Sequence, residues 1–250
     1  NSNHARIEWV GEKRNPIDGG IDKEGAARGM SRNYDAVILS VGFGLEAGDS
    51  SYWRNETLGQ PGLKEARRTY LLSGQGDGAM IDLLRIRLSQ FRQDRILDEI
   101  FSGHDGLLEQ LRILRTAFLS DEKGLFAKFE QLAHPSSMHH DDMDKVIRKL
   151  SSRLRRDTDV VLQLLVRNVA ELLDPSNSRM SFQNALLVYL LYRGGGFSPS
   201  AESERAICAR FGIAKNDVIK RHGVKPLAQL ARSLPEEVYD EIERRRTSEQ

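Results

Sequence analysis

The fold of this chain depends on the stretch Thr69-Tyr-Leu-Leu-Ser-Gly-Gln-Gly-Asp-Gly-Ala-Met-Ile-Asp-Leu-Leu-Arg85. A short apolar run meets three glycines at alternate positions, and a helical pattern that continues to Phe101 begins directly after them. This order predicts a strand, a tight loop and a helix N-terminus. Such a junction directs free backbone N–H groups and the positive end of the helix dipole at one point, where glycines let a phosphate approach. The stretch therefore predicts nucleotide binding.

The composition is that of a globular chain without a membrane span. Its 250 residues are 39% hydrophobic and 29% charged, which fits one or two domains with a sizeable core. The formal net charge of +1 creates no global field that favours nucleic acid or membrane. The single cysteine, Cys208, rules out an internal disulfide framework, and no run reaches the roughly 20 apolar residues of a membrane helix. We expect a cytoplasmic protein with no membrane partner.

Strand patterns and helix patterns divide the chain in two. Fourteen of the 21 glycines lie in residues 1–103, where apolar runs at 4–10, 34–41 and 70–72 predict strands. Beyond residue 103 the pattern is helical, and residues 182–192 are apolar on nearly all sides, as in a central helix. The predicted fold class is α/β followed by all-α, with a Rossmann-like domain over 1–103 and an all-helical domain over 104–250.

Two glycine motifs match the dinucleotide pattern G-x-G-x-x-A. The first begins at Gly42 and lacks a following helix, so its simpler interpretation is a strand end and a loop. The second runs from Gly74 through Gly76 to Ala79 and has both strand and helix; with Gly78 it equally matches the G-x-G-x-G of a methyltransferase loop. Both interpretations require a second parallel strand with an acidic residue for a ribose hydroxyl, and the sequence predicts none. The structural alternative is a tight turn that packs a helix on a sheet.

The chain resembles the two-dinucleotide-domain flavoproteins, the glutathione-reductase-like group, over about residues 4–90. One shared element is an apolar strand closed by Ser40-Val-Gly42, where the family usually has Ala-Thr-Gly, and the other is a strand that leads into Gly76-Asp77 and a helix. The resemblance implies that residues 34–41 and 69–72 are neighbouring parallel strands. It also implies FAD as the cofactor, alone or together with NAD(P)H, and it places Asp77 on the flavin ribityl chain. The cofactor-binding residues that it implies are Gly42, Gly74, Gly76, Asp77 and Gly78.

The resemblance also implies a function. We expect part of an FAD-dependent oxidoreductase that acts on an unknown small molecule, with the N-terminal part of the same protein as a partner, because the family's first strand, glycine fingerprint and helix are absent from this chain. No cysteine pair is present, which excludes a disulfide reductase, and we name no catalytic residue. The alternatives are an S-adenosylmethionine-dependent transferase and a helical interaction or nucleic-acid-binding module.

Two weaker patterns bear on these alternatives. Residues 202–223 resemble a helix-turn-helix, although Arg221 stands where that motif has an apolar residue, and we expect packed helices rather than nucleic-acid binding. Residues 138–144 are rich in His and Asp, but acids in a first helical turn are ordinary, so we assign no metal site.

Overall fold

The computed structural model describes residues 5–9, 13–14, 21–22, 30–34, 67–120, 123–177, 180–222 and 236–248. The chain divides into two compact units, Asn1–Gly44 and Leu45–Gln250. In the first unit, β1 (Ala5–Trp9) pairs antiparallel with β4 (Met30–Tyr34), and β2 (Lys13–Arg14) pairs antiparallel with β3 (Ile21–Asp22). The strand predicted over residues 4–10 is therefore confirmed.

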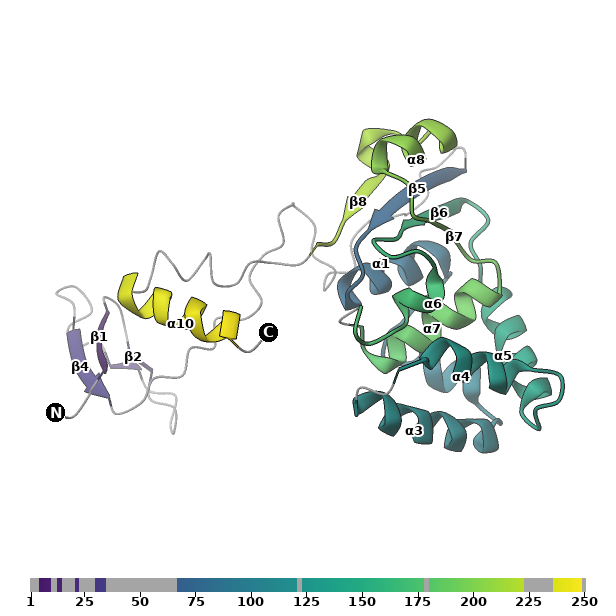
Figure 1. Ribbon diagram of the computed structural model, residues 1–250, viewed down its shortest axis with the longest axis horizontal. Coiled ribbons are helices and arrows are strands. Elements are labelled where there is room, and N and C mark those ends of the chain that lie inside the picture. Colours follow the sequence, from purple (N-terminus) through teal and green to yellow (C-terminus); the bar gives the residue numbers. More distant parts are fainter. Residues whose placement is uncertain are drawn as a thin grey trace. The chain divides into compact units, whose positions relative to one another are not determined.

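A four-stranded parallel sheet organises the second unit (Figure 1). Its strands are β5 (Arg68–Ser73), β6 (Thr158–Gln163), β7 (Ser198–Ser200) and β8 (Val218–Lys220), in the spatial order β7-β6-β5-β8. Counted along the chain, this order is third, second, first, fourth, which is how the classic Rossmann sheet begins. The second unit is therefore a Rossmann-like parallel α/β fold, and its strand order reverses between β5 and β8.

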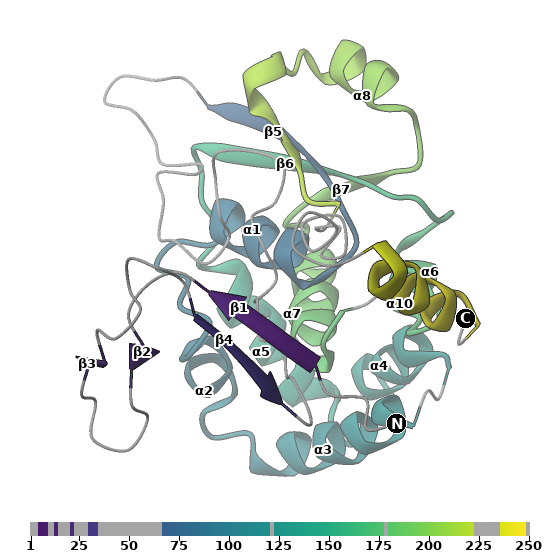
Figure 2. The same cartoon turned by 90° about the vertical axis from the view of Figure 1, so that its left-hand side faces the viewer.

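Helices cover both faces of this sheet. Tyr70 and Leu72 of β5 belong to the main core, on the side of α1 (Asp77–Arg87) and α7 (Phe182–Arg193). Leu71 belongs to a second core under α8 (Glu204–Phe211), and both views place α8 across the sheet from α1 and α7 (Figure 1, Figure 2). Burial on both faces explains why β5 is a continuous apolar run rather than an alternating one.

The helices beyond α1 match the predicted helical pattern in part. The remaining helical elements are α2 (Ile96–Phe101), α3 (Asp105–Leu119), α4 (Leu125–Ala133), α5 (His140–Ser151), α6 (Val169–Leu172), the short 3-10 helix η1 (Lys215–Asp217) and α10 (Glu236–Ser248). The predicted central helix is confirmed, since α7 is buried from Ala185 to Leu191. The long helix predicted up to Phe101 is wrong, because α1 ends at Arg87 and Leu88 then forms a bridge with Leu154.

The all-helical domain predicted over residues 104–250 is also wrong. Strands β6, β7 and β8 lie in this range, and all three belong to the sheet that contains β5. Val160, Val161 and Leu162 of β6 are buried. A short run buried on both faces cannot be told from a buried helix by periodicity. The second helix predicted within residues 202–223 is wrong too. Gly212, with φ at 64°, ends α8, and strand β8 lies where that helix was expected.

The predicted pairing of residues 34–41 with β5 is not observed. Tyr34 ends β4 in the separate antiparallel pair, and residues 35–41 and Gly42 lie outside the described residues. Leu71 and Leu72 pair with β6 on one side and β8 on the other. Both edges of β5 are therefore paired at these two positions by strands other than the predicted one, and the rest of the predicted pairing falls on residues outside the described part of the chain.

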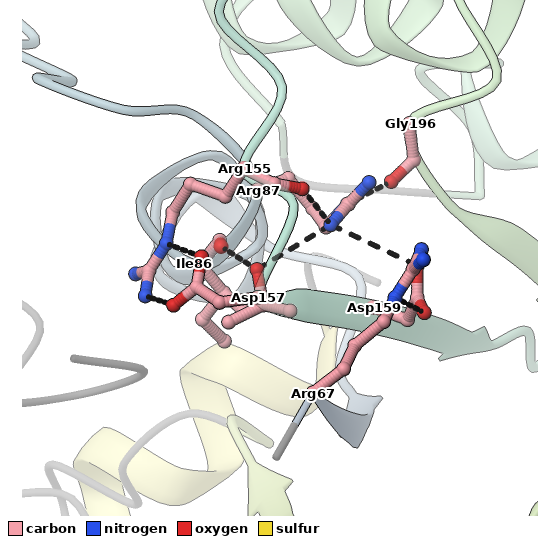
Figure 3. Close-up of polar contacts among 8 residues, drawn as sticks. Arg67, Ile86, Arg87, Arg155, Asp157, Asp159 and Gly196 are labelled. Carbon is pink, nitrogen blue, oxygen red and sulfur yellow. Dashed lines mark hydrogen bonds and ion pairs between the residues drawn. The ribbon is translucent and has the colours of Figure 1, made fainter. Parts of the chain in front are cut away.

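The buried guanidinium of Arg87, at the end of α1, holds the amino edge of the sheet (Figure 3). It donates to the backbone oxygens of Gly196 and Arg155 and to the hydroxyl of Thr158, and it lies 3.8 Å from a carboxylate oxygen of Asp159. Burial lowers the pKa of Arg87, and the charge of Asp159 opposes this effect. The cluster joins α1, β6 and the segment after α7 at the opposite end of the strands from the glycine loop.

Candidate functional site

The loops that follow the four parallel strands all begin at the carboxyl edge of the sheet. Ser73 lies opposite Gln163 on one side and Lys220 on the other, and Gln163 lies opposite Ser200. The four parallel strands therefore end in one row. In open α/β sheets ligands bind outside the carboxyl ends of the strands, where the strand order reverses. Here that point lies between the loops after β5 and β8.

Gly74 is needed for close packing at this point. Its φ is +151°, and a Cβ added there would lie 2.3 Å from the backbone oxygen of Arg221 and 2.9 Å from the Cβ of Ala79. The first distance is far below any normal contact, and backbone cannot move aside as a flexible side chain can. Gly74 therefore lets the end of β8 and the start of α1 pack against β5 at once.

Gly76, unlike Gly74, has open space where a side chain would lie. Its backbone is extended, with φ at −94° and ψ at 177°, and an added Cβ meets no described heavy atom within 4 Å. Gly76 is the N-cap residue of α1, so the amides of Asp77, Gly78 and Ala79 have no intrahelical acceptor, whereas that of Met80 donates to the Gly76 oxygen. The backbone at Gly76 can thus be approached closely by a ligand.

A side-chain donor lies in the same loop. The amide nitrogen of Gln75 is buried and makes no hydrogen bond within the described part of the chain. A buried donor without an acceptor costs about 1–3 kcal/mol, so a partner at this position would be stabilising. Within the described residues, the glycine loop therefore contains a buried donor that has no acceptor.

Asp77 does not cap its own helix. It is the first residue of α1, and its Oδ1 accepts hydrogen bonds from the backbone nitrogen of Ser181 at 2.7 Å and from the side-chain amide of Asn184 at 2.6 Å. Ser181 is the N-cap of α7, whose N-terminus therefore lies against the N-terminus of α1. Asn184 is only 2% exposed. The carboxylate is held at the junction of two helix N-termini, which sequence reasoning did not foresee.

The end of β6 differs from the dinucleotide pattern. The acidic residue expected for a ribose hydroxyl is absent there, because β6 ends at Gln163, which donates from its side chain to the backbone oxygen of Glu202. The loop that follows carries Leu165, which is 72% exposed, and Arg167, which forms an ion pair with Glu171. Contact with a ribose at this strand would have to use an amide or a cation.

The end of β8 contributes two further polar contacts. The guanidinium of Arg221 donates to Asp82 of α1 at 2.6 Å, and both side chains are buried. Next to it, His222 is exposed, and its Nε2 lies 2.9 Å from the hydroxyl of Ser73, which is 2% exposed. The sequence predicted packed helices over residues 202–223, and it therefore missed both contacts.

The His- and Asp-rich segment at 138–144 has structural contacts. Asp142 lies 3.0 Å from Nδ1 of His104, which joins α5 to the start of α3, and His140 bonds to the backbone oxygen of Ala133. Within the described ranges no three His, Cys, Asp or Glu side chains are grouped in a way that could hold a metal ion.

Comparison with protein-family models, curated proteins and solved structures found no match. In the part of the chain that the structure describes, each helix is too short or too polar to span a bilayer.

Proposed function

We propose that this chain binds FAD at the carboxyl edge of its parallel sheet and contributes that site to an FAD-dependent redox reaction. One observation carries the proposal, namely the division of roles among Gly74, Gly76 and Ala79 after the first strand of the sheet. In a dinucleotide fingerprint, the first small residue makes the tight turn, the second lets the backbone approach the pyrophosphate, and the third packs helix on strand. Here Gly74 is tightly enclosed, Gly76 is open, and Ala79 is 1% exposed.

The parallel strand β6 supports this proposal. The fingerprint at Gly74 requires a second parallel strand, which the sequence did not predict. Strand β6 is such a strand, although the five helices α1 to α5 lie between β5 and β6 along the chain. The amides at the start of α1 would receive the pyrophosphate, and the unpartnered amide of Gln75 is a further donor in the same loop. When bound, FAD supplies a flavin ring that accepts and donates hydride or electrons.

Asp77 is the proposed ligand of the ribityl hydroxyls, with Gly74, Gly76 and Gly78 around the pyrophosphate. The contacts to Ser181 and Asn184 both use Oδ1, so the second oxygen of the Asp77 carboxylate is the acceptor proposed for a hydroxyl. Because two donors already hold the carboxylate in place, its side chain would lose little conformational entropy when a ligand binds.

FAD affinity tests this proposal directly. FAD is titrated into the 250-residue chain and followed by flavin fluorescence, with ADP as a competitor that shares only the adenosine and pyrophosphate. Asp77→Asn keeps an oxygen that can accept from Ser181 and Asn184, so it should unfold like the wild type. It should nevertheless weaken FAD about 10- to 100-fold, because a charged hydrogen bond is lost. Its affinity for ADP should not fall.

Two results would contradict this assignment. If the wild-type chain binds neither FAD nor ADP, the site does not take a dinucleotide. If Asp77→Asn keeps wild-type affinity for FAD, Asp77 serves only to join α1 to α7.

The second candidate is S-adenosylmethionine binding, and the same observation of β6 favours it, since a methyltransferase loop also needs a following parallel strand. The two candidates differ in charge. S-Adenosylmethionine has no phosphate, so the one anionic group that it could offer to the N-terminus of α1 is its amino-acid carboxylate, which carries less charge than a pyrophosphate. Displacement of bound FAD by ADP supports the dinucleotide, whereas tight S-adenosylmethionine binding that ADP does not disturb supports the transferase.

A further inference from the structure

We propose that His222 contacts the bound dinucleotide, donating a hydrogen bond from Nδ1 to an oxygen of the pyrophosphate. This inference rests on the proposed function and adds a binding residue from β8 to the site formed by β5 and α1. His222 follows strand β8, two residues after Lys220, which is paired with Ser73 of β5. It therefore lies at the carboxyl edge of the sheet, between whose strands β5 and β8 the strand order reverses.

The backbone before His222 is firmly positioned. The Arg221 nitrogen donates to the backbone oxygen of Ser73 at 2.7 Å, and the Arg221 side chain is tied to Asp82 at 2.6 Å. The Arg221 backbone oxygen also occupies the space beside Gly74. The backbone and the side chain of Arg221 are thus both fixed, and they hold His222 next to the glycine loop.

The contact between Nε2 of His222 and the Ser73 hydroxyl can form with either imidazole tautomer, because a hydroxyl both donates and accepts. Among the described residues, Nε2 of His222 is the partner found for the Ser73 hydroxyl, which is buried. In the proposed arrangement the buried hydroxyl donates its one hydrogen to Nε2, the acceptor within reach among the described residues, so the neutral ring carries its proton on Nδ1. Nδ1–H makes no hydrogen bond to the described part of the chain, and the ring is exposed. It can therefore donate to a ligand oxygen.

A nucleophilic role for Ser73 is not supported by the same geometry. Its side chain is 2% exposed and lies in a strand paired on both edges, so a substrate carbonyl cannot reach the hydroxyl. Ser73 acts as a positioning residue that orients the ring of His222.

Three substitutions at His222 separate ligand contact from support of Ser73. The amide nitrogen of Asn stands near the place of Nδ1, whereas that of Gln reaches the place of Nε2. If Nδ1 contacts the pyrophosphate, His222→Asn should keep affinity for FAD and ADP close to that of the wild type. His222→Gln and His222→Ala should lose about tenfold or more for both, as expected for a hydrogen bond to an anion. Thermal unfolding of each variant without ligand shows whether the fold is intact.

The opposite order of affinities would overturn the inference, because a role limited to holding Ser73 is rescued by Gln and not by Asn. Equal affinities in the wild type and all three variants would also overturn it while leaving the proposed function intact. If the wild-type chain binds neither FAD nor ADP, the proposed function fails, and this inference fails with it. His134→Ala, at an exposed histidine in the turn after α4, is the matched control and should bind as the wild type does.

Discussion

Replacing Arg221 by leucine should destabilise the fold far more than replacing both members of its ion pair. The guanidinium lies 2.6 Å from Asp82, and the two side chains are 4% and 0% exposed. Arg221→Leu would leave the Asp82 carboxylate buried, and breaking a buried pair in this way costs about 3–5 kcal/mol. Because Arg85 lies 3.7 Å from the other carboxylate oxygen, part of the charge stays compensated, and we expect a loss near 3 kcal/mol.

The double variant Asp82→Leu/Arg221→Leu supplies the comparison. It removes both charges and leaves two apolar side chains in their place, so its stability should lie within about 1 kcal/mol of the wild type. Urea unfolding followed by circular dichroism gives the free energies for the wild type, both single variants and the double variant. A loss below about 1 kcal/mol for Arg221→Leu alone, or a double variant as unstable as the sum of the single ones, would refute the reasoning.

Three further predictions concern packing and charge. Gly74→Ala should cost about 2–4 kcal/mol in urea unfolding, because the new methyl group meets the backbone oxygen of Arg221 at a strained φ, and a neutral result would contradict the packing described. Leu187→Ala, in the core of α7 at 2% exposure, should cost about 2–5 kcal/mol, and a value near zero would place that face of α7 outside the core. A hydrogen bond from Arg155 holds the pKa of Asp157 below its ordinary value, so the stability from this pair is present above about pH 4 and is lost as the pH falls through the lower folded pKa. Urea midpoints measured down to about pH 2.5 should therefore fall less for Asp157→Asn than for the wild type, and parallel curves would contradict the assignment.

Local signals could be predicted from the sequence. The strand, glycine loop and helix start from Arg68 to Asp77 follow one another directly, and each is marked by its own residues. Helices α3 and α4 show apolar faces over two or more turns, which periodicity detects, and α7 is apolar on nearly all sides, as a buried helix is. The helical pattern expected beyond residue 103 was accordingly correct for these three helices.

Long-range pairing could not be predicted. Thr158 pairs with Arg68, which lies far away along the chain, and the apolar run of β6 fits a buried helix as well as a strand. Strands β7 and β8 have three residues each, too few for an alternating pattern to be recognised. Only the structure could therefore show the four-stranded sheet and the reversal of strand order beside Gly74.

The same limit applies to the candidate site. Gly74, Gly76 and Asp77 lie within one loop, so their proximity was evident from the sequence. Asn184 meets Asp77 across 107 positions, and His222 meets Ser73 across 149. An asparagine within an otherwise apolar helix was the one available signal for Asn184. No local pattern distinguishes His222 from a histidine at a helix end.

FAD affinity of Gly76→Ala tests the central claim most directly. The added methyl group meets no described heavy atom within 4 Å, and its backbone angles suit alanine, so the variant should unfold like the wild type. Gly106→Ala in α3 is the matched control, since its new methyl group meets only a ring carbon of His139 at 3.9 Å. If the backbone at Gly76 receives the pyrophosphate, Gly76→Ala should bind FAD about tenfold or more weakly, and Gly106→Ala should bind as the wild type does. Equal affinity for FAD in all three proteins, or no binding by any of them, would contradict the account.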